Sequence, residues 1–404
     1  MPNDRAGQNP PPKDNGSWLS PGVIGIGSAS FFSDVGHEIP TALLPSLLTS
    51  LGGPAAALGL IEGIANAAAG LARLAGGPIA DDPASRRRVA VGGYISTAVF
   101  SSLIGVAAAA WQVGAFRLAA WTARGLRVPA RNALLADVVT SESYGRAYGF
   151  ERAMDNLGAI IGPLLALLMV GLIGVRDAIL VSVVPGLLAA AAIWFAVRQV
   201  SHSKSRERTR LRIAVGPLLS GKLGRLFLGL SAFELGNVAA TLLILRATQM
   251  LSPEWGLQRA TQIALALYTA YNLAATLISI PAGHFVDKRG AISVLAAAPL
   301  LFCAAFISFA LGSLPMLAVG FVLAGIGIGC AETAQSAAVA SLAPKTLRGS
   351  AFGLLAAMQS FGNLAASAIA GILWTFLSPV TAFIYLASWM LVGAAAIVGT
   401  RLRA

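Results

Sequence analysis

Two stretches of this chain, GRAYGFERAMDNLG at 145–158 and GSAFGLLAAMQSFG at 349–362, align when the sequence is shifted by 204 residues. In the same register the aromatic residue Tyr148 meets Phe352. The alignment predicts that the chain consists of two related halves. The positions that are identical in the two stretches are Gly145, Ala147, Gly149, Ala153, Met154 and Gly158.

The composition indicates a membrane protein. Hydrophobic residues make up 56% of the 404 residues, charged residues make up only 11%, and the mean hydropathy is +0.74. Soluble domains carry about a quarter charged residues. The net charge of +12 does not indicate nucleic-acid binding, because the basic residues do not gather on a solvated domain. We expect a chain that crosses the lipid bilayer many times.

Twelve apolar segments are long enough to cross a bilayer as helices. The shift of the repeat equals six of these segments, so the two halves keep the same orientation about an axis along the membrane normal. The expected fold class is an all-α membrane protein with twelve transmembrane helices in two pseudo-symmetric six-helix bundles. The expected spans are 20–49, 55–79, 88–110, 113–137, 145–172, 177–198, 219–250, 259–286, 291–312, 315–341, 348–376 and 379–400.

The polar segments set the expected domain boundaries. Residues 1–19 are polar and proline-rich and lack the apolar core of a signal peptide, so we expect a disordered cytoplasmic tail. A charged stretch, RQVSHSKSRERTRLR at 198–212, predicts a cytoplasmic linker over 199–218. The linker separates an N-terminal bundle, 20–198, from a C-terminal bundle, 219–404.

The basic residues predict the orientation. With the N-terminus inside, 20 of the 29 lysine and arginine residues fall in the tail, the cytoplasmic loops and the linker. The outer loops contain only Arg176 and Arg259. Since cytoplasmic loops are enriched in basic residues, we expect both termini to be cytoplasmic.

Paired loops connect the sequence to a known family. The loop after span two is GPIADDPASRRR at 77–88, and the loop after span eight is GHFVDKRG at 283–290. The second follows the pattern G-x-x-x-D-K-x-G, whereas the first keeps Gly77 and Asp81 but has Asp82 where a basic residue is usual. Together with twelve spans and parallel halves, these loops resemble the major facilitator superfamily over nearly the whole chain.

The resemblance implies a central cavity between the bundles and a rocking motion between inward-open and outward-open states. It also implies that the paired loops close the cytoplasmic side. Span five adds a Gly-x-x-x-Gly-Pro pattern, whose small residues permit close helix approach. Antiporters of the superfamily carry a longer form of this pattern, so the resemblance favours export. The expected gating residues are Gly77, Asp81, Arg86, Gly283, Asp287, Lys288, Gly158, Gly162 and Pro163.

Each loop carboxylate is expected to meet the start of a helix of the other half when the cytoplasmic side is closed. Asp81 is expected at the start of span eleven, with Arg348 adding positive charge. Asp287 is expected at the start of span five, near Gly145 and Arg146. A helix N-terminus offers free N–H donors and a partial positive charge. We expect the contact of Asp287 to be the stronger.

Three further stretches resemble a bacterial subgroup of permeases that are often labelled drug-resistance proteins. They are FFSDVGHEIPTALLPSLL at 31–48, LGLIEGIA at 58–65 and RGLRVPARNALLAD at 124–137. That subgroup usually has an aspartate in span seven after Gly-Asn, where this chain has GNVAATLL at 236–243. The resemblance implies a location in the plasma membrane, the inner membrane of a bacterium.

Span four carries four arginines on about one quarter of the helix circumference, Arg117, Arg124, Arg127 and Arg131. A buried guanidinium in a bilayer costs at least about 2.5–3.5 kcal/mol. These side chains must therefore face a protein interior or an aqueous cavity and have counter-charges. The acids that can serve form two i, i+4 pairs, Asp34 with Glu38 and Glu151 with Asp155.

Two interpretations of these arginines stay open. Arg124 and Arg127 can bind an anionic group of a substrate bidentately. Alternatively, they pair with Glu151 and Asp155 as part of the structure. For Arg131 we favour an ion pair.

Acids at membrane depth are candidates for function. We expect Asp34 and Glu38 to couple transport to protons, because an arginine that moves can switch the protonation of a buried carboxyl. Arg117 stands where the resemblance places an arginine linked to proton transfer, although Trp121 replaces its usual companion glycine. The alternative is a static salt bridge. For His37, expected to point away from its neighbours, we favour a structural role.

Further polar side chains in the spans complete the expected substrate site. Most are expected to form interhelical hydrogen bonds, and Glu234 and Glu332 are the better candidates for the cavity lining. The expected substrate-binding residues are Arg124, Arg127, Glu62, Asn66, Asp155, Glu234, Asn237, Tyr271, Glu332 and Gln359.

The sequence predicts neither an enzyme nor a cofactor or metal site. It contains no P-loop pattern, so ATP is not the expected energy source. The histidines lack the spacing of a zinc site, and the two cysteines form no C-x-x-C pair.

The leading prediction is a monomeric, proton-coupled secondary transporter that exports amphipathic drugs or other organic compounds. Its expected partners are a small-molecule substrate, protons and the lipid bilayer, and no nucleic acid. The alternative within transport is an organic-anion carrier, by symport or exchange, that uses the arginines of span four. An alternative of another class is a membrane sensor or scaffold that kept the fold without transport, and it predicts no ligand-dependent conformational change.

Overall fold

The structure, a computed structural model, describes residues 18–52, 55–199 and 215–402. Most of the predicted tail and of the predicted linker lies outside these residues. Over the described residues the chain forms helices and no strand. This arrangement agrees with the all-α class predicted from the sequence.

The described residues of the N-terminal half form six α-helices and two single-turn 3-10 helices, Ile104–Val106 and Ser141–Ser143. Proline is the first residue of two of the α-helices, Pro21 in one and Pro83 in the other, where its missing N–H costs no hydrogen bond. The Ser20 hydroxyl accepts a hydrogen bond from the Val23 N–H at 3.3 Å and so caps the first helix. The helices are α1 (Pro21–Ser50), α2 (Ala55–Asp81), α3 (Pro83–Leu103), α4 (Ala110–Asp137), α5 (Tyr144–Val181) and α6 (Val183–Gln199).

The C-terminal half repeats this arrangement after a single-turn helix, α7 (Val215–Leu218). Its helices are α8 (Gly221–Glu234), α9 (Ala240–Arg289), α10 (Ala291–Leu311), α11 (Leu314–Leu342), α12 (Arg348–Phe376) and α13 (Pro379–Leu402).

Among the described residues, eight helical segments are long and apolar enough to cross a membrane. Two of them, Ser141–Arg198 and Ala240–Arg289, are long enough for two crossings each. Each contains one glycine with positive φ at which the helix changes direction, Gly174 (φ 81°) and Gly256 (φ 74°). The more polar α1 and α4 complete the twelve crossings.

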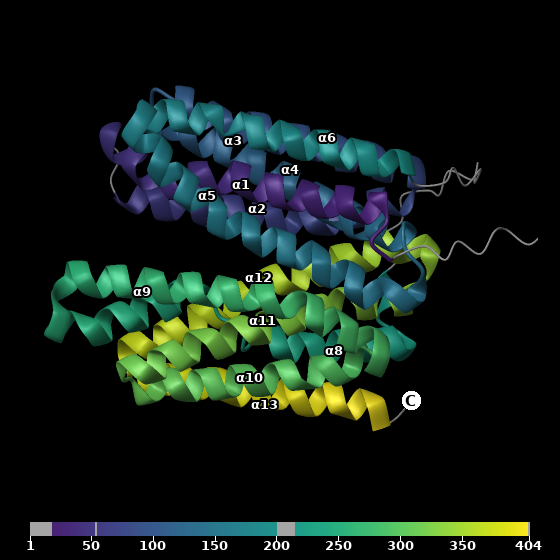
Figure 1. Cartoon of the computed structure of the whole chain (residues 1–404). Coiled ribbons are helices and arrows are strands. Elements are labelled where there is room, and N and C mark those ends of the chain that lie inside the picture. Colours follow the sequence, from purple (N-terminus) through teal and green to yellow (C-terminus); the bar gives the residue numbers. More distant parts are fainter. Residues whose placement is uncertain (1–17, 53–54, 200–214, 403–404) are drawn as a thin grey trace, which may run out of the picture.

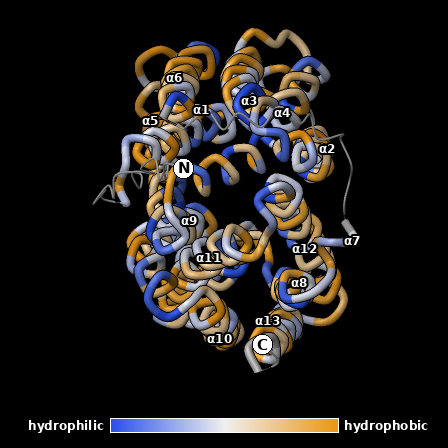
Figure 2. The backbone as a smooth tube through the Cα atoms, turned by 90° about the vertical axis from the view of Figure 1, so that its right-hand side faces the viewer, coloured by the Kyte–Doolittle hydropathy of each residue, from blue (hydrophilic) through white to orange (hydrophobic). Residues whose placement is uncertain are grey.

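Figure 1 shows the helices in two groups, α1 to α6 above and α8 to α13 below. Figure 2 views the molecule from the end at which α1 begins and α13 ends, and the two groups face each other there. We call this the terminal end. Large apolar side chains point outward, as lipid contact requires, and Leu167 and Leu172 are each 75% exposed.

The seventh crossing falls within the expected span 219–250, but it is not one continuous helix. α8 ends at Glu234, and helix resumes only at Ala240. The break contains Gly236 and Asn237, both poor helix formers. The Ala239 N–H, which has no helical partner at this start, donates to the Ser367 hydroxyl at 2.9 Å.

The two halves meet at the terminal end through glycines. A Cβ on Gly145 of α5 would lie 2.2 Å from the carbonyl oxygen of Gly283 in α9. A Cβ on Gly349 of α12 would lie 2.6 Å from the carbonyl oxygen of Gly77 in α2. Gly145 and Gly349 occupy the same position of the sequence repeat, so the two crossings are copies of one another. At both crossings, the main chain of one helix packs directly against the main chain of the other.

Candidate functional site

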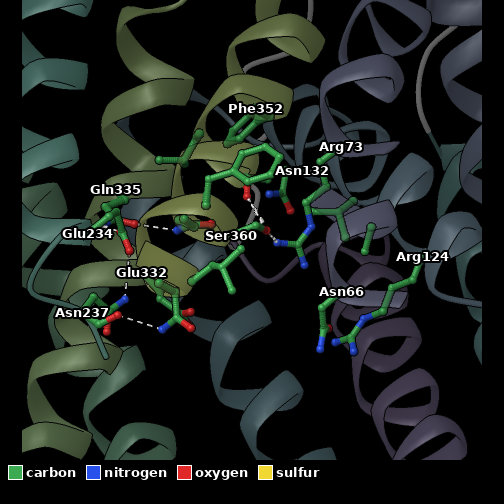
Figure 3. Close-up of a pocket in the computed structure, with 18 of the residues that line it drawn as sticks. Asn66, Arg73, Arg124, Asn132, Glu234, Asn237, Glu332, Gln335, Phe352 and Ser360 are labelled. Atoms are coloured by element: carbon green, nitrogen blue, oxygen red, sulfur yellow. Dashed lines mark hydrogen bonds between the residues drawn. The ribbon is translucent and has the colours of Figure 1, made fainter. Parts of the chain in front are cut away.

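A cavity of about 620 Å³ lies between the two halves. Helices α2, α4 and α5 line one wall, and α8, α11 and α12 line most of the other (Figure 3). Eight of the ten predicted substrate-binding residues line it, whereas Glu62 and Tyr271 lie outside the lining. The charged and amide residues of the lining are Asn66, Arg73, Arg124, Arg127, Arg131, Asn132, Arg152, Asp155, Glu234, Asn237, Glu332, Gln335, Gln359 and Asn363.

Arg131 is fully paired with acids of α5. Its Nη1 lies 2.7 Å from Glu151 Oε1 and 3.4 Å from Asp155 Oδ1. The Ser30 hydroxyl donates to the same Glu151 oxygen at 2.7 Å, and Glu151 is 0% exposed. The ion pair favoured for Arg131 is therefore present. The acids of α5 pair with Arg131 and Arg152 and not with Arg124 or Arg127, so the expected partners of those two arginines are not the ones found. Arg124 pairs with Asp34 instead, and substrate binding by Arg124 and Arg127 stays a prediction.

Arg124 lies against the polar face of α1. Its Nη2 is 3.3 Å from Asp34 Oδ1, and its Nη1 is 2.6 Å from His37 Nε2. The carbonyl oxygen of Ser33, 2.8 Å from His37 Nδ1, can only accept, so Nδ1 carries the proton and Nε2 accepts from Arg124. Glu38 Oε1 is 3.4 Å from His37 Nε2. The histidine thus lies at the centre of the cluster.

The expectation that His37 points away from its charged neighbours is therefore wrong. Helical angles describe the direction of Cβ, whereas a long guanidinium from α4 reaches across to the ring. Proton coupling by Asp34 and Glu38 stays a prediction, and His37 joins the group that contacts them.

Arg117 is buried in a separate cluster. Its Nη2 is 2.8 Å from Glu62 Oε1, its Nη1 donates to the Thr41 hydroxyl at 2.9 Å, and its guanidinium lies 3.4 Å from the centroid of the Trp121 ring. The indole N–H donates to Asn66 Oδ1 at 2.9 Å. Tryptophan in place of glycine thus gives Arg117 a cation–π partner.

Two arginines of the cavity wall have no carboxylate partner among the described residues. Arg127 Nη2 donates to the Ser33 hydroxyl at 2.6 Å, and its guanidinium packs 3.8 Å from the centroid of the Tyr94 ring. Arg73 donates to the Ser360 hydroxyl and, at 3.2 Å, to the carbonyl oxygen of Ala356. The Nε of both arginines is buried without a hydrogen-bond partner. The guanidinium groups of Arg73 and Arg127 can therefore each still bind an anion.

Arg152 is a lining residue that the sequence did not single out. Its Nη1 lies 3.4 Å from Asp155 Oδ2 and 3.7 Å from Glu332 Oε2 of α11, so it links the two halves. It lies inside the repeated stretch, where α12 has Ala356 at the matching position. A charge confined to one copy of a repeat is the signal that would have identified it.

The opposite wall contains a network of acids and amides. Asn237 Nδ2 donates to Glu234 Oε2 at 2.9 Å, and Gln335 Nε2 donates to Glu234 Oε1 at 3.0 Å. Gln359 Nε2 donates in turn to Gln335 Oε1 at 2.7 Å. Figure 3 shows Glu234, Asn237 and Gln335 on the side away from Arg73 and Arg124.

Glu234 occupies in the second half the place that Asp34 has in the first. A Cβ on Gly158 would lie 2.8 Å from Asp34 Cβ, and a Cβ on Gly362, its repeat mate, would lie 2.5 Å from Glu234 Cβ. The sequence contains the signal, since DVGH at 34–37 corresponds to ELGN at 234–237. The symmetry places one such acid in each half, and of the two Glu234 lines the cavity.

The other predicted residues of the spans lie in helix contacts. Gly158 and Gly162 let α5 pack against α1 within one half, next to Asp34 and Glu38. Pro163 follows them within α5. The Tyr271 ring stacks on Tyr268 at 5.6 Å between centroids.

Asp287 and Asp81 make the expected contacts at the terminal end. Asp287 accepts from the N–H groups of Gly145 at 2.6 Å and Arg146 at 3.1 Å, and from Arg146 Nε at 2.7 Å. Asp81 accepts from the Ser350 N–H at 2.9 Å and from the Ser350 hydroxyl. Each carboxylate thus meets the first turn of a helix of the other half.

Arg348 does not add to the Asp81 contact, which corrects that expectation. Its Nη1 lies 3.4 Å from Asp137 at the end of α4, and its Nη2 donates to the Tyr144 hydroxyl at 3.0 Å. Arg86 pairs with the same Asp137 carboxylate. Lys288 lies in the last turn of α9.

Asp82, which departs from the loop motif, caps α3. Its carboxylate accepts from the Ser85 N–H at 2.9 Å. Hydrogen bonding by Ser85 holds the pKa of Asp82 below its ordinary value.

The comparisons with known proteins agree with one another. The family description Major Facilitator Superfamily matches residues 26–252 and 237–403. An uncharacterised MFS-type transporter of Methanocaldococcus jannaschii is 30% identical over 92% of this chain and 93% of its own length. An uncharacterised protein of Mycobacterium tuberculosis is 28% identical over 87% of this chain and 85% of its own length.

Solved structures of transporters share the fold. The human organic anion transporter MFSD10 (TETRAN) superposes with a TM-score of 0.72 at 18% identity, covering 93% of this chain and 99% of that one. A bacterial homologue of the iron transporter ferroportin, in an outward-facing state, superposes with a TM-score of 0.73 at 15% identity, covering 94% and 99%.

Proposed function

Because the chain belongs to the major facilitator superfamily and is a multi-pass membrane transporter, we propose that it carries an organic anion together with protons by alternating access. The observation that supports this substrate class is the charge of the cavity, whose lining contains five arginines and three acids. A cavity with excess positive charge concentrates anions and repels lipophilic cations.

The lining also favours an apolar part of the substrate. Trp121, Ile328, Phe352 and Phe361 lie among the polar groups. Ligand sites usually combine apolar walls with a few placed polar groups. An amphipathic organic anion therefore fits this cavity better than a small inorganic ion. We accordingly favour the organic-anion carrier over the export of drugs in general.

We further propose that the terminal end faces the cytoplasm of a bacterial cell. The excess of basic residues in the loops of that end supports this orientation. The contacts of Asp81 and Asp287 then close the cavity toward the cytoplasm. The state described here is therefore assigned as outward-facing.

Proton coupling is assigned to Asp34. Its carboxylate competes with a substrate anion for Arg124, from which it lies 3.3 Å away. Protonation of Asp34 removes this competitor and frees the guanidinium. Proton binding and anion binding then favour each other, which is the coupling that symport requires.

Asp34→Asn is expected to abolish transport driven by a pH gradient, because the amide cannot gain or lose a proton. The measurement is anion uptake into proteoliposomes with and without a proton gradient. The variant is expected to lose at least roughly tenfold of the gradient-driven rate, about 1.4 kcal/mol in coupling free energy. Glu254→Gln, an exposed acid of α9, is the matched control. Full gradient-driven uptake by Asp34→Asn would contradict the assignment.

Arg127→Gln is expected to weaken anion binding while leaving neutral ligands unaffected. Arg127 has no carboxylate partner in the described residues, so the change breaks no ion pair. A hydrogen bond to a charged group contributes about 1.5–3 kcal/mol, or roughly 10- to 150-fold in affinity. Calorimetric titration of matched anionic and neutral ligands measures the difference.

The control for this variant is Arg176→Gln, which changes an arginine outside the cavity lining. An equal loss of affinity for both ligand charges would count against the proposal. If Arg127→Gln does not fold, Arg124→Gln tests the same point, since Arg124 is part-exposed to the cavity.

A further inference from the structure

The charges of the cavity are separated by wall. All five lining arginines come from α2, α4 and α5 of the first half. Two of the three lining acids, Glu234 and Glu332, come from α8 and α11 of the second. The third acid, Asp155, lies on the arginine wall and pairs with Arg131 and Arg152. Figure 3 shows Arg73 and Arg124 on one side and Glu234 and Glu332 on the other.

Glu234 has no cationic partner among the described residues. It is 1% exposed, and both carboxylate oxygens accept hydrogen bonds only from the amides of Asn237 and Gln335. A buried carboxylate without a counter-charge is costly. Glu234 is also the last residue of α8, where the helix dipole is negative and favours a cation nearby. When Glu234 is ionised, its negative charge therefore has no counter-charge among the described residues.

Glu332 adds negative charge to the same wall. Its side chain is 28% exposed, and its one ion pair within the described part of the chain is the 3.7 Å contact with Arg152. Arg152 is shared with Asp155, which lies closer, at 3.4 Å. The Glu332 carboxylate is thus open to the cavity and only weakly engaged.

On the opposite wall, two arginines lack negatively charged partners among the described residues. Arg73 and Arg127 are held by hydroxyl and carbonyl oxygens or an aromatic ring, and the Nε of each has no hydrogen-bond partner. Among the described residues, a buried guanidinium, that of Arg127, and a part-buried one, that of Arg73, have no carboxylate partner, and on the opposite wall the buried Glu234 carboxylate has no cationic partner. A single molecule that carries both charges satisfies both walls.

We propose that the substrate is a zwitterion, an organic anion that also bears an ammonium group. The anionic group binds at Arg73 and Arg127, and the ammonium group binds at Glu234. This inference rests on the proposed anion carrier and names its substrate class more closely. It also gives the amides of Asn237 and Gln335 a role, because they hold the Glu234 carboxylate in place for the ammonium group.

The test uses purified full-length protein and three sets of ligands. The first set comprises unbranched ω-amino acids, from β-alanine to ε-aminocaproate, and dipeptides. The second comprises their N-acetyl derivatives, which lack the ammonium charge, and the third comprises their primary amides, which lack the carboxylate. A ligand that binds the folded state raises thermal stability according to its affinity. We expect at least one zwitterion to bind at least tenfold more tightly than both of its derivatives.

The variants locate the two charges. In Glu234→Gln, the zwitterion is expected to bind no better than its N-acetyl derivative, whereas binding of the N-acetyl anion is unchanged. Arg127→Gln is expected to weaken both of these ligands. Glu254→Gln makes the same chemical change on an exposed residue of α9 and is expected to keep the preference for the zwitterion.

Two outcomes would contradict the proposal of a zwitterionic substrate. One is a panel in which no zwitterion binds better than its N-acetyl derivative. The other is a Glu234→Gln variant that keeps the full preference. If N-acetyl anions still bind in an Arg127-dependent manner, the anion carrier stands and only the ammonium site fails. If none of the carboxylate ligands binds, both proposals fail.

Discussion

Gly283→Ala is expected to force the two halves apart at the terminal end. The new Cβ would lie 2.2 Å from the carbonyl oxygen of Gly145, and the nearest atoms are main chain, which cannot rotate away. Ordinary carbon contacts are about 3.5–4.0 Å, so α5 and α9 must separate by about 1–2 Å. Overpacking of this kind costs about 1–3 kcal/mol, which changes the ratio of closed to open states roughly 5- to 150-fold.

Spin-label distances measure this shift. Labels at Glu142 and Lys288, both exposed near the crossing, report its separation after Cys303 and Cys330 are replaced. We expect a longer and broader distance distribution in Gly283→Ala. Gly171→Ala is the matched control in α5, because a Cβ there meets nothing within 4 Å. Unchanged distances in Gly283→Ala would show that the crossing does not limit closure.

Removing the charge of either carboxylate at the two crossings is also expected to favour the open state, but less strongly than Gly283→Ala. Asp287→Asn and Asp81→Asn retain the shape of the side chain but remove the charge that faces a helix N-terminus. That charge contributes about 0.3–1 kcal/mol, and up to about 2 kcal/mol when partly buried. Asp287 accepts three hydrogen bonds and Asp81 two, so Asp287→Asn is expected to open its crossing further.

Glu151→Gln is expected to cause the largest loss of stability among the charged residues. Arg131 is 4% exposed, and the change removes its closest counter-charge, 2.7 Å away. Breaking a buried ion pair from one side costs about 3–5 kcal/mol, because the remaining charge stays buried. Asp155, at 3.4 Å, is already shared with Arg152 and compensates only in part.

The free energy of unfolding in mixed micelles, with increasing denaturant, measures this loss. Glu142→Gln, which changes an exposed acid, is expected to alter it by less than about 0.5 kcal/mol. A loss below about 1 kcal/mol for Glu151→Gln would mean that Asp155 alone neutralises Arg131.

The architecture was predictable because it depends on long-range patterns in the sequence. The repeat of 145–158 at 349–362 and the spacing of apolar segments lead directly to two parallel six-helix halves. The acidic partners of Arg131 were predictable for a related reason. Charges at membrane depth need counter-charges, and few acids are available within the spans.

The break after Glu234 was not predictable from hydropathy, because hydropathy reports how apolar the side chains are and not the conformation of the main chain. Residues 235–239 are apolar enough to continue a span, and only the Gly-Asn pair disfavours the helix. The contacts of His37, Arg152 and Arg348 were missed for a second reason. Long side chains choose among several partners, and that choice depends on how helices from distant parts of the sequence approach.

The break in the seventh crossing has a mechanical consequence. The segment Ala240–Trp255, from the break to the residue before Gly256, is a lever of about 24 Å. A rotation of about 10° at its base moves its far end by about 4 Å, close to the thickness of an alkyl chain. The fulcrum lies beside Glu234 and Asn237, whose hydrogen bonds a bound ligand would exchange. A small rearrangement at the break would thereby be magnified at the far end of this segment.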